Sequence, residues 1–339
     1  MQIQQNFSLR SYNTFGIDVS SAFFSSFASL DALAELTTFC NEKNHLPKLV
    51  LGGGSNVLFT QDFRGIVLKN DLKGNELVKE DASHYYVRSA GGENWHQFVL
   101  FCLNNNYAGV ENLSLIPGNV GASPIQNVGA YGVEIKDVFH ELEAWHFQDQ
   151  KLVIFTAADC KFDYRDSVFK TKYKGQFVIT NVTFKLLKQP VYHTNYGAIQ
   201  QELASMAVTE LSIQAIADAV IKIRRSKLPD PEVIGNAGSF FKNPAIPVSR
   251  FENLKASYPT LPGYPAKNDT VKIAAGWLIE QCGWKGFRRG DTGCHEKQAL
   301  VLVNYGNASG IDIYALSTEI MHSVETKFGI LLEREVNII

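Results

Sequence analysis

The stretch of residues 116–132 is the part of the chain best suited to hold an anionic ligand through its backbone. It reads IPGNVGASPIQNVGAYG and contains four glycines, two prolines and no charged side chain. Glycine and proline interrupt helices and central strands, and a solvated linker would normally be rich in Lys, Glu or Ser. The segment is therefore expected to be a loop that packs closely against a partner and offers its backbone N–H groups. Proteins hold a pyrophosphate through N–H groups of this kind. The segment therefore predicts a bound dinucleotide.

A second glycine-rich turn, GGGSN at residues 52–56, follows a short buried strand predicted over residues 47–51. A strand that feeds such a turn brings backbone close to phosphate. The turn lacks the G-x-G-x-x-G spacing of a Rossmann fingerprint, and no Lys-Ser/Thr pair follows it as in a P-loop. The sequence thus predicts a nucleotide-binding fold of neither common type.

Apolar periodicity predicts the elements that must position these loops. Helices are expected over residues 30–41, 95–102, 216–223, 274–281 and 311–328. Strands are expected over residues 47–51, 85–87, 142–144, 152–155, 177–184, 299–303 and 330–339. Ser212 is expected to cap the helix at 216–223, and the turn-rich stretch 228–238 resembles a domain boundary.

Composition narrows the class of protein. The 339 residues, 45% apolar and 19% charged, are typical of a soluble globular protein of two or three domains. A net charge of −2 leaves no basic field for nucleic acid or an anionic membrane. There is no signal-peptide core and no run of about 18 apolar residues that could span a bilayer. Five cysteines without a Cys-x-x-Cys pair fit reduced thiols, so a cytoplasmic protein is expected.

Three further clusters complete a set of motifs. They are FDYRDS around Arg165, GNAGSFFKNP around Ser239, and LEREV with Glu335. Together with GGGSNVLF, IPGNVGASPIQNVGAYG and RRSKLPDP, they resemble the UDP-N-acetylenolpyruvoylglucosamine reductases, flavoenzymes that complete UDP-N-acetylmuramate synthesis for bacterial cell walls. The motifs occur in the family's order over nearly the whole chain.

The resemblance implies an α+β fold. Residues 1–65 and 66–228 should form the two subdomains of an FAD-binding fold of the vanillyl-alcohol-oxidase/PCMH type, and residues 229–328 an α+β substrate-binding domain. Residues 329–339 should form a strand that returns Glu335 to the active site. The HTNYGAI segment indicates the longer type of the family, in which Tyr196 closes over the substrate. We expect a monomer, although no motif fixes the oligomeric state.

The activity implied is the FAD-dependent, NADPH-consuming reduction of UDP-N-acetylglucosamine enolpyruvate to UDP-N-acetylmuramate in peptidoglycan synthesis. Hydride passes from flavin N5 to the terminal enolpyruvyl carbon, and negative charge develops on the neighbouring carbon and its carboxylate. The site must supply preorganised donors and positive charge, and a proton. Arg165 suits the first task because a guanidinium is permanently charged and bidentate. Glu335, if protonated, adds a donor, and Ser239 delivers the proton.

Two choices stay open at this point. A serine gives up its proton to carbon only where its alkoxide is stabilised, and Lys227 and Lys242 are both candidates for that role. Glu333 and Glu335 lie two residues apart on one strand face, so spacing does not separate them. The family's terminal Glu-x-Glu favours Glu335, although Arg334 stands where close relatives are expected to carry a proline.

The resemblance also implies the ligand-binding residues. Those expected to bind FAD, without a covalent bond, are Gly52, Gly53, Gly54, Ser55, Asn56, Pro117, Gly118, Gly121, Ala122, Ser123, Ile125, Gln126, Gly129, Ala130, Tyr131 and Arg224. Those expected to bind the sugar nucleotide are Tyr196, Lys227, Asn243 and Gln298. Asn119 occupies a position where some relatives carry cysteine, which should not matter if the loop acts through its backbone. The eight histidines show no ligand spacing, so no metal is expected.

Two other functions remain open. One is another flavin-dependent oxidase of the same fold that uses dioxygen; it is disfavoured because the C-terminal motifs match a nucleotide-sugar site. The other is a catalytically inactive nucleotide-sugar binding protein; it is disfavoured because Arg165, Ser239 and Glu335 are all present. The sequence does not indicate how strongly NADPH is preferred over NADH, because the motifs that mark a 2′-phosphate pocket are known for Rossmann folds and this chain has no Rossmann fingerprint.

Overall fold

The computed structural model describes residues 2–339, which form two compact units. The first unit comprises residues up to Phe7, Ser21–Gly54 and Phe63–Ser226. The second comprises Ser8–Ser20, Ser55–Asp62 and Lys227–Ile339. The chain therefore passes between the units several times before residue 63.

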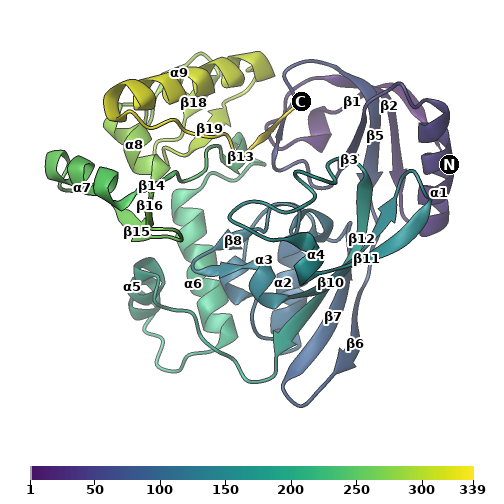
Figure 1. The fold of residues 1–339 in the computed structure, drawn as a ribbon, viewed down its shortest axis with the longest axis horizontal. Helices are drawn as coiled ribbons and strands as arrows, with labels where there is room; N and C mark the ends of the chain where they lie inside the picture. The colour runs from purple at the N-terminus through teal and green to yellow at the C-terminus, as the bar shows by residue number, and fades with distance from the viewer. Residues whose placement is uncertain (1) are drawn as a thin grey trace. The chain divides into compact units, whose positions relative to one another are not determined.

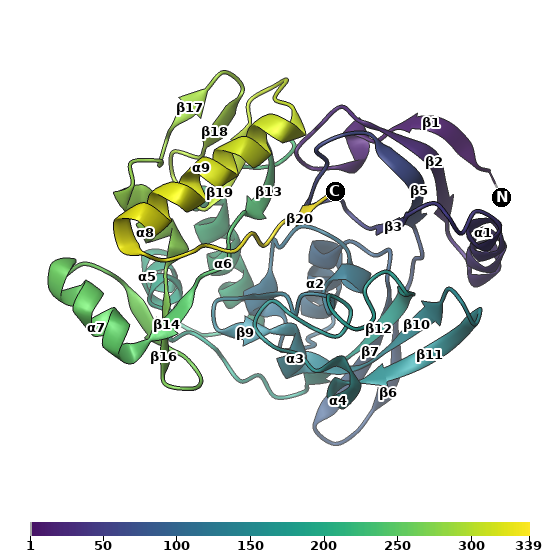
Figure 2. The ribbon, with the colours of Figure 1, turned by 45° about the horizontal axis from the view of Figure 1, so that its top comes forward.

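The first unit begins with a sheet whose four strands lie in the order β1 (Gln4–Ser8), β2 (Ser20–Phe27), β5 (Phe63–Asn70) and β3 (Lys48–Leu51). Strands β2 and β3 both run parallel to β5. Helix α1 (Leu30–Glu42) makes the crossover from β2 to β3, two parallel strands that flank β5, and it lies beside this sheet (Figure 2). It begins at Ser29, whose side chain accepts the N–H of Ala32, and it buries Leu33 and Leu36.

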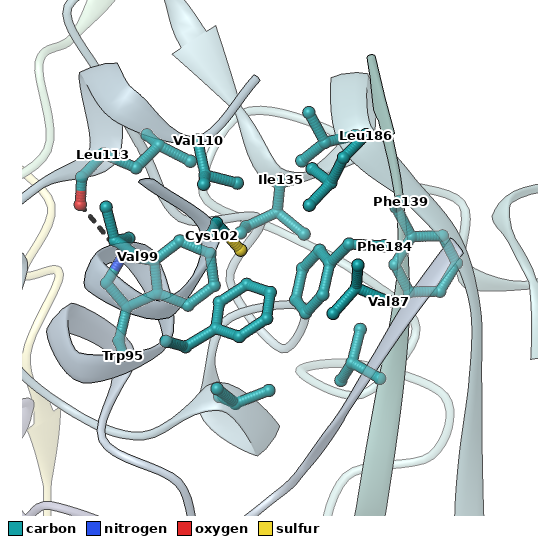
Figure 3. Packing of buried hydrophobic residues seen from close by; sticks show 14 of the residues in the cluster. Val87, Trp95, Val99, Cys102, Val110, Leu113, Ile135, Phe139, Phe184 and Leu186 are labelled. Carbon is teal, nitrogen blue, oxygen red and sulfur yellow. Dashed lines mark hydrogen bonds between the residues drawn. The ribbon is translucent and has the colours of Figure 1, made fainter. Parts of the chain in front are cut away.

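The second sheet of this unit is antiparallel throughout, in the order β11 (Lys151–Thr156), β10 (Phe139–His146), β12 (Phe177–Leu187), β7 (His84–Ala90) and β6 (Asn75–Glu80). Helix α2 (Trp95–Asn104) contributes Trp95, the largest fully buried side chain, to the core beside this sheet (Figure 3). The rings of Trp95, Phe98 and Phe184 are almost fully buried and meet with centroids 4.7–5.7 Å apart. The Trp95 indole donates to the carbonyl of Leu113 at 2.9 Å, so α2 also fixes the segment after it.

The remaining elements of the first unit are short, apart from α5 and α6: η2 (Glu111–Leu113), η3 (Val120–Ala122), β8 (Gly129–Ala130), β9 (Val133–Glu134), α3 (Ile135–Val138), α4 (Ala157–Cys160), α5 (Gly197–Ser205) and α6 (Ile213–Lys227). Helices α5 and α6 pack through a separate apolar cluster that includes Ile199, Ile216 and Val220 (Figure 1). The Ser212 hydroxyl accepts the N–H of Ala215, so the predicted N-cap of α6 is confirmed.

The second unit contains η1 (Arg10–Tyr12), β4 (Val57–Leu58), β13 (Gly235–Ser239), β14 (Ala245–Pro247), α7 (Val248–Ser257), β15 (Gly263–Pro265), β16 (Thr270–Ile273), α8 (Ala275–Gln281), β17 (Arg288–Arg289), β18 (Thr292–Cys294), β19 (Val301–Asn304), α9 (Gly310–Phe328) and β20 (Asn337–Ile338). Its main sheet is antiparallel with the order β13, β19, β18, β17. Helix α9 begins at a reciprocal cap between Ser309 and Asp312 and ends at Gly329 in the left-handed conformation.

Residues 8–20 belong to this second unit because their backbone bonds to β13 and β19. The Thr14 carbonyl accepts the N–H of Asn236 at 3.0 Å, and the Asn304 side chain donates to the carbonyl of Phe15 at 2.8 Å. A Cβ at Gly235 would lie 2.3 Å from that same carbonyl oxygen. Only glycine allows so close an approach.

All the predicted helices are present, and the predicted strands are confirmed except the last. Residues 330–339 were expected to form one strand, and this expectation is wrong over most of its length. Only Asn337–Ile338 form a ladder, parallel to β4, and Arg334 makes an isolated bridge to Phe241. The segment changes partner along its course, so no long ladder can develop. No helix within residues 2–339 is long and apolar enough to cross a bilayer.

Candidate active site

The two glycine-rich loops touch each other in the first unit. A Cβ placed on Gly53 would lie 2.9 Å from Oδ1 of Asn119 and 3.0 Å from Cα of Gly118. A Cβ on Gly121 would lie 3.0 Å from backbone atoms of Gly91. A side chain at Gly53 would push the two loops apart, and one at Gly121 would push its loop away from the turn before α2. The contact creates the kind of backbone-lined surface to which a dinucleotide can come close.

Hydrogen bonds hold the first half of the 116–132 loop against the turn before α2. The N–H groups of Val120 and Gly121 donate to the carbonyls of Glu93 and Gly91, each at 2.9 Å. The Asn119 side chain is buried and donates to the carbonyl of Gly92 at 2.8 Å. The asparagine at position 119, where some relatives carry cysteine, was expected not to matter if the loop acts through its backbone. The structure instead gives its side chain a role in holding the loop.

The second half of the loop is fixed by Asn127, which no sequence signal singled out. Its side chain is fully buried and donates to Glu134 Oε2 at 3.1 Å and to the carbonyl of Asp163 at 3.0 Å. It also accepts the N–H of Lys136 at 3.0 Å. The stretch contains other polar residues, among them Asn119, Ser123 and Gln126, so the sequence does not distinguish Asn127 from them.

Arg165 is held by the loop that it faces. Its Nη2 donates to the carbonyl of Gly129 at 2.6 Å, and its Nη1 contacts the carbonyl of Asn127 at 3.4 Å. A Cβ on Gly129 would lie 2.7 Å from Cγ of Glu134, 3.0 Å from the carbonyl oxygen of Val133 and 3.2 Å from Nη1, so this crowded position requires glycine. The backbone of Arg165 is left-handed, with φ of 53°. This conformation is unfavourable for a residue with a Cβ, and such strain is concentrated at functional sites.

Two tyrosines expected to contact ligands meet in the first unit. The rings of Tyr131 and Tyr196 pack edge to face with centroids 5.6 Å apart. Tyr131 ends the cofactor loop with φ of 51°, and Tyr196 precedes α5 with 47% of its surface exposed. Burial raises the pKa of the Tyr131 phenol, while the guanidinium of Arg224 acts in the opposite sense. Arg224 also donates from Nε to the carbonyl of Leu115 at 3.2 Å.

Ser239 and Glu335 lie close together in the second unit. Ser239 ends β13, is exposed, and follows Gly238, whose φ is +70°. The next residue, Phe240, accepts the N–H of Glu335 at 2.8 Å. This backbone hydrogen bond therefore brings Glu335 close to Ser239.

Glu333, the alternative to Glu335, makes structural contacts in the second unit. Glu333 is an exposed residue that forms an ion pair with Lys242, and their backbones are also hydrogen bonded. Arg334 points toward α9, where it bonds Ser317 and Thr318 and covers the ring of Tyr314. These contacts give Glu333, Lys242 and Arg334 structural partners.

Two of the expected substrate residues gather at the start of α8. The Asn243 Oδ1 accepts the N–H of Ala275 at 2.9 Å. The Gln298 Oε1 lies 3.0 Å from where a Cβ on Gly276 would stand. Lys227 is exposed at the end of α6. Within residues 2–339, no three His, Cys, Asp or Glu side chains are grouped as a metal site would require.

The paired glycine loops, in a unit with a parallel βαβ sheet and an antiparallel sheet, define a protein that binds FAD. Residues 22–155 match the family described as FAD binding domain. Residues 230–339 match the family described as UDP-N-acetylenolpyruvoylglucosamine reductase, C-terminal domain. The predicted fold class is therefore confirmed.

Full-length relatives identify the family. The chain is 49% identical over 340 residues to the UDP-N-acetylenolpyruvoylglucosamine reductase of Flavobacterium johnsoniae, with both chains covered in full. It is 48% identical over 338 residues to that of Pseudomonas putida, covering 100% of this chain and 99% of the relative. The protein belongs to the UDP-N-acetylenolpyruvoylglucosamine reductase family; it is an oxidoreductase, and its cofactor is FAD.

A solved structure supports the fold. The crystal structure of the Thermus caldophilus reductase of this name aligns with a TM-score of 0.66 at 21% identity, over 100% of this chain and 99% of that one. At this identity the likeness concerns the fold alone.

Proposed function

We propose that this protein reduces UDP-N-acetylglucosamine enolpyruvate to UDP-N-acetylmuramate, with NADPH as the electron donor. The proposal rests on the family to which the whole chain belongs and on one structural observation: Arg165 is held in a strained backbone conformation by the cofactor loop itself. Left-handed backbone is unfavourable for a residue with a Cβ and is concentrated at functional sites, which supports a role for Arg165 at the cofactor.

When bound, FAD accepts a hydride from the nicotinamide and passes a hydride to the enolpyruvyl carbon. We propose that the two glycine-rich loops hold FAD, with their backbones brought close to it at Gly53, Gly118 and Gly121. We propose that Tyr131 and Arg224 complete the cofactor site. Their mutual contact places a phenol and a cation next to the end of the loop.

Arg165 is proposed to stabilise the carboxylate and the charge that develops beside it. A guanidinium keeps its charge at any physiological pH and presents paired donors, which match a carboxylate. Because the loop carbonyls already fix its position, no reorganisation is needed as charge develops.

Ser239 is proposed to give its proton to the carbon next to the carboxylate, and Glu335 to donate a hydrogen bond to the enolate. Their closeness in the second unit supports this pairing. Since Lys242 is paired with Glu333, Lys227 is the better candidate for stabilising the serine alkoxide. Arg165 belongs to the other compact unit, and its action together with Ser239 and Glu335 is part of the proposal.

We propose that Tyr196, Lys227, Asn243 and Gln298 bind the sugar nucleotide. Tyr196 is exposed at the start of α5 and rests against Tyr131, so it is placed to cover a ligand that reaches the cofactor loop. We also propose that the protein acts as a monomer in the cytoplasm.

One experiment tests the reaction. The purified protein should be yellow, NADPH should bleach it without oxygen, and the enolpyruvyl sugar nucleotide should restore the colour. An oxidase would recover its colour mainly with oxygen, and a binding protein would not be bleached; either result would overturn the proposal. Denaturation should release FAD into solution, because a non-covalent cofactor is expected.

A further inference from the structure

Residues 110–115 lie just before the cofactor loop and contain none of the residues assigned to a ligand above. The side chains of Glu111, Asn112, Leu113 and Ser114 are all 0–1% exposed. Polar side chains buried this completely are kept for the hydrogen bonds they make.

The Asn112 side chain joins two separate segments. Its Nδ2 donates to the carbonyl of Tyr131 at 3.0 Å and to the carbonyl of His193 at 2.8 Å. Tyr131 ends the cofactor loop, and His193 lies three residues before Tyr196 in a segment without helix or strand. One amide group therefore holds the backbone of both tyrosine-bearing segments.

The oxygen of the Asn112 amide, unlike its nitrogen, makes no hydrogen bond within the described residues. Its Oδ1 is buried and accepts no hydrogen bond from residues 2–339. A buried, unpaired carbonyl oxygen is unfavourable. Within residues 2–339, the amide is therefore held by the two bonds that its nitrogen makes.

Asn112 stands on a rigid support. The carbonyl of Leu113 accepts from the Trp95 indole, and the N–H of Leu115 donates to Nδ1 of His96 at 3.1 Å. Burial lowers the pKa of His96, which favours the neutral ring that can accept this bond. With α2 holding the segment on this side, a movement of either tyrosine segment must break a bond to Asn112 or displace its partner.

We infer that Asn112 is a positioning residue that couples the Tyr196 segment to the cofactor loop, and so holds Tyr196 where it can cover the sugar nucleotide. This inference rests on the proposed function of Tyr196. Asn112 itself is not expected to touch any ligand; it acts through the two backbones that it joins.

Asn112→Leu, which keeps the size and removes both donors, should raise the KM for the enolpyruvyl sugar nucleotide about tenfold, the effect of losing about two neutral hydrogen bonds. Bleaching by NADPH should change much less. Hydrogen exchange should quicken in residues 188–196 beyond any change in the rest of the protein. In Asn112→Ser, the side chain is too short to reach either carbonyl, so the same changes in KM and in hydrogen exchange are expected. This variant is used if Asn112→Leu does not fold.

A double-mutant cycle with Tyr196→Ala separates coupling from general damage. In the Tyr196→Ala protein, Asn112→Leu should raise the KM no further; additive effects would overturn the inference. If Tyr196→Ala alone leaves the KM unchanged, the proposed role of Tyr196 fails instead.

Asn181→Leu is the matched control, because Asn181 also has a buried, unpaired Oδ1 and one donor bond, to Glu143. It should leave the KM and the exchange of residues 188–196 unchanged.

Discussion

At the scale of single residues, three members of the candidate site share an unfavourable backbone conformation. Asn127, Tyr131 and Arg165 all have left-handed φ values between 41° and 53°. Each of the three is tied by hydrogen bonds through its side chain or its carbonyl. A lysine in place of Arg165 could not hold two loop carbonyls with one planar group.

The serine provides the sharpest test of the proposed chemistry. In Ser239→Ala, reduction of the flavin by NADPH should persist, while reoxidation by the enolpyruvyl sugar nucleotide should slow by several orders of magnitude, because only that half-reaction needs a carbon acid. Anaerobic stopped-flow absorbance measures both steps. Ser239 is exposed, so its loss should not impair folding. Equal slowing of the two half-reactions would show that the serine is structural.

Glu111 should make stability depend on pH. Burial raises the pKa of this carboxyl above its ordinary value of about 4.5, against the opposing charge of His193 and the N–H of Gly109. The folded state then binds its proton more tightly than the unfolded state, so this group stabilises the fold at low pH, and its contribution is lost as pH rises through the raised pKa. Glu111→Gln should therefore be more stable than the parent above that pH.

Thermal denaturation at a series of pH values measures this effect. The difference in Tm between Glu111→Gln and the parent should grow in favour of the variant as pH rises above about 4.5 and then level off. The control is Glu210→Gln, an exposed residue of the same unit, for which no such trend is expected. A parallel pH profile for Glu111→Gln and the parent would contradict the assignment.

At the scale of elements, the site depends on two loops fitting against each other. The sequence indicated both loops through their glycines, and it indicated α1, α2, α6 and α9 through their apolar spacing. It did not indicate that Asn119 would fill the space between the loops, or that Asn112 would bond a segment 81 residues further along the chain. Such contacts depend on tertiary structure, which local periodicity does not encode.

Gly53→Ala tests the fit of the loops. The added Cβ would lie 2.9 Å from Oδ1 of Asn119 and 3.0 Å from Cα of Gly118. Because the latter is backbone, the loops must separate, at about 1–3 kcal/mol, the usual cost of overpacking. FAD affinity, measured by flavin fluorescence on titrating apoprotein, should fall accordingly.

A glycine with free space around it serves as the comparison. In Gly197→Ala, the Cβ would meet no atom within 4 Å, and the residue has no left-handed backbone. This variant should retain the parent's FAD affinity. If Gly53→Ala binds FAD as tightly as Gly197→Ala does, the contact between the loops does not matter for the cofactor.

At the scale of the whole molecule, the family and the order of its motifs could be predicted from the sequence, but the composition of the two compact units could not. Residues 8–20 and 55–62 belong with the C-terminal half because of bonds such as those of Thr14 and Asn304. Nothing in their composition points to partners more than two hundred residues away. The proposed catalytic residues divide in the same way, with Arg165 in one unit and Ser239 and Glu335 in the other.

The short ladder between β4 and β20 has a consequence for how the protein is made. Asn56 and its bonding partner Asn337 are separated by 281 positions, and β4 lies directly after the first glycine turn. A ribosome delivers the chain from the amino end, so β4 must wait, without its partner strand, until translation has passed residue 338. The nascent polypeptide can complete its second unit only at that late stage.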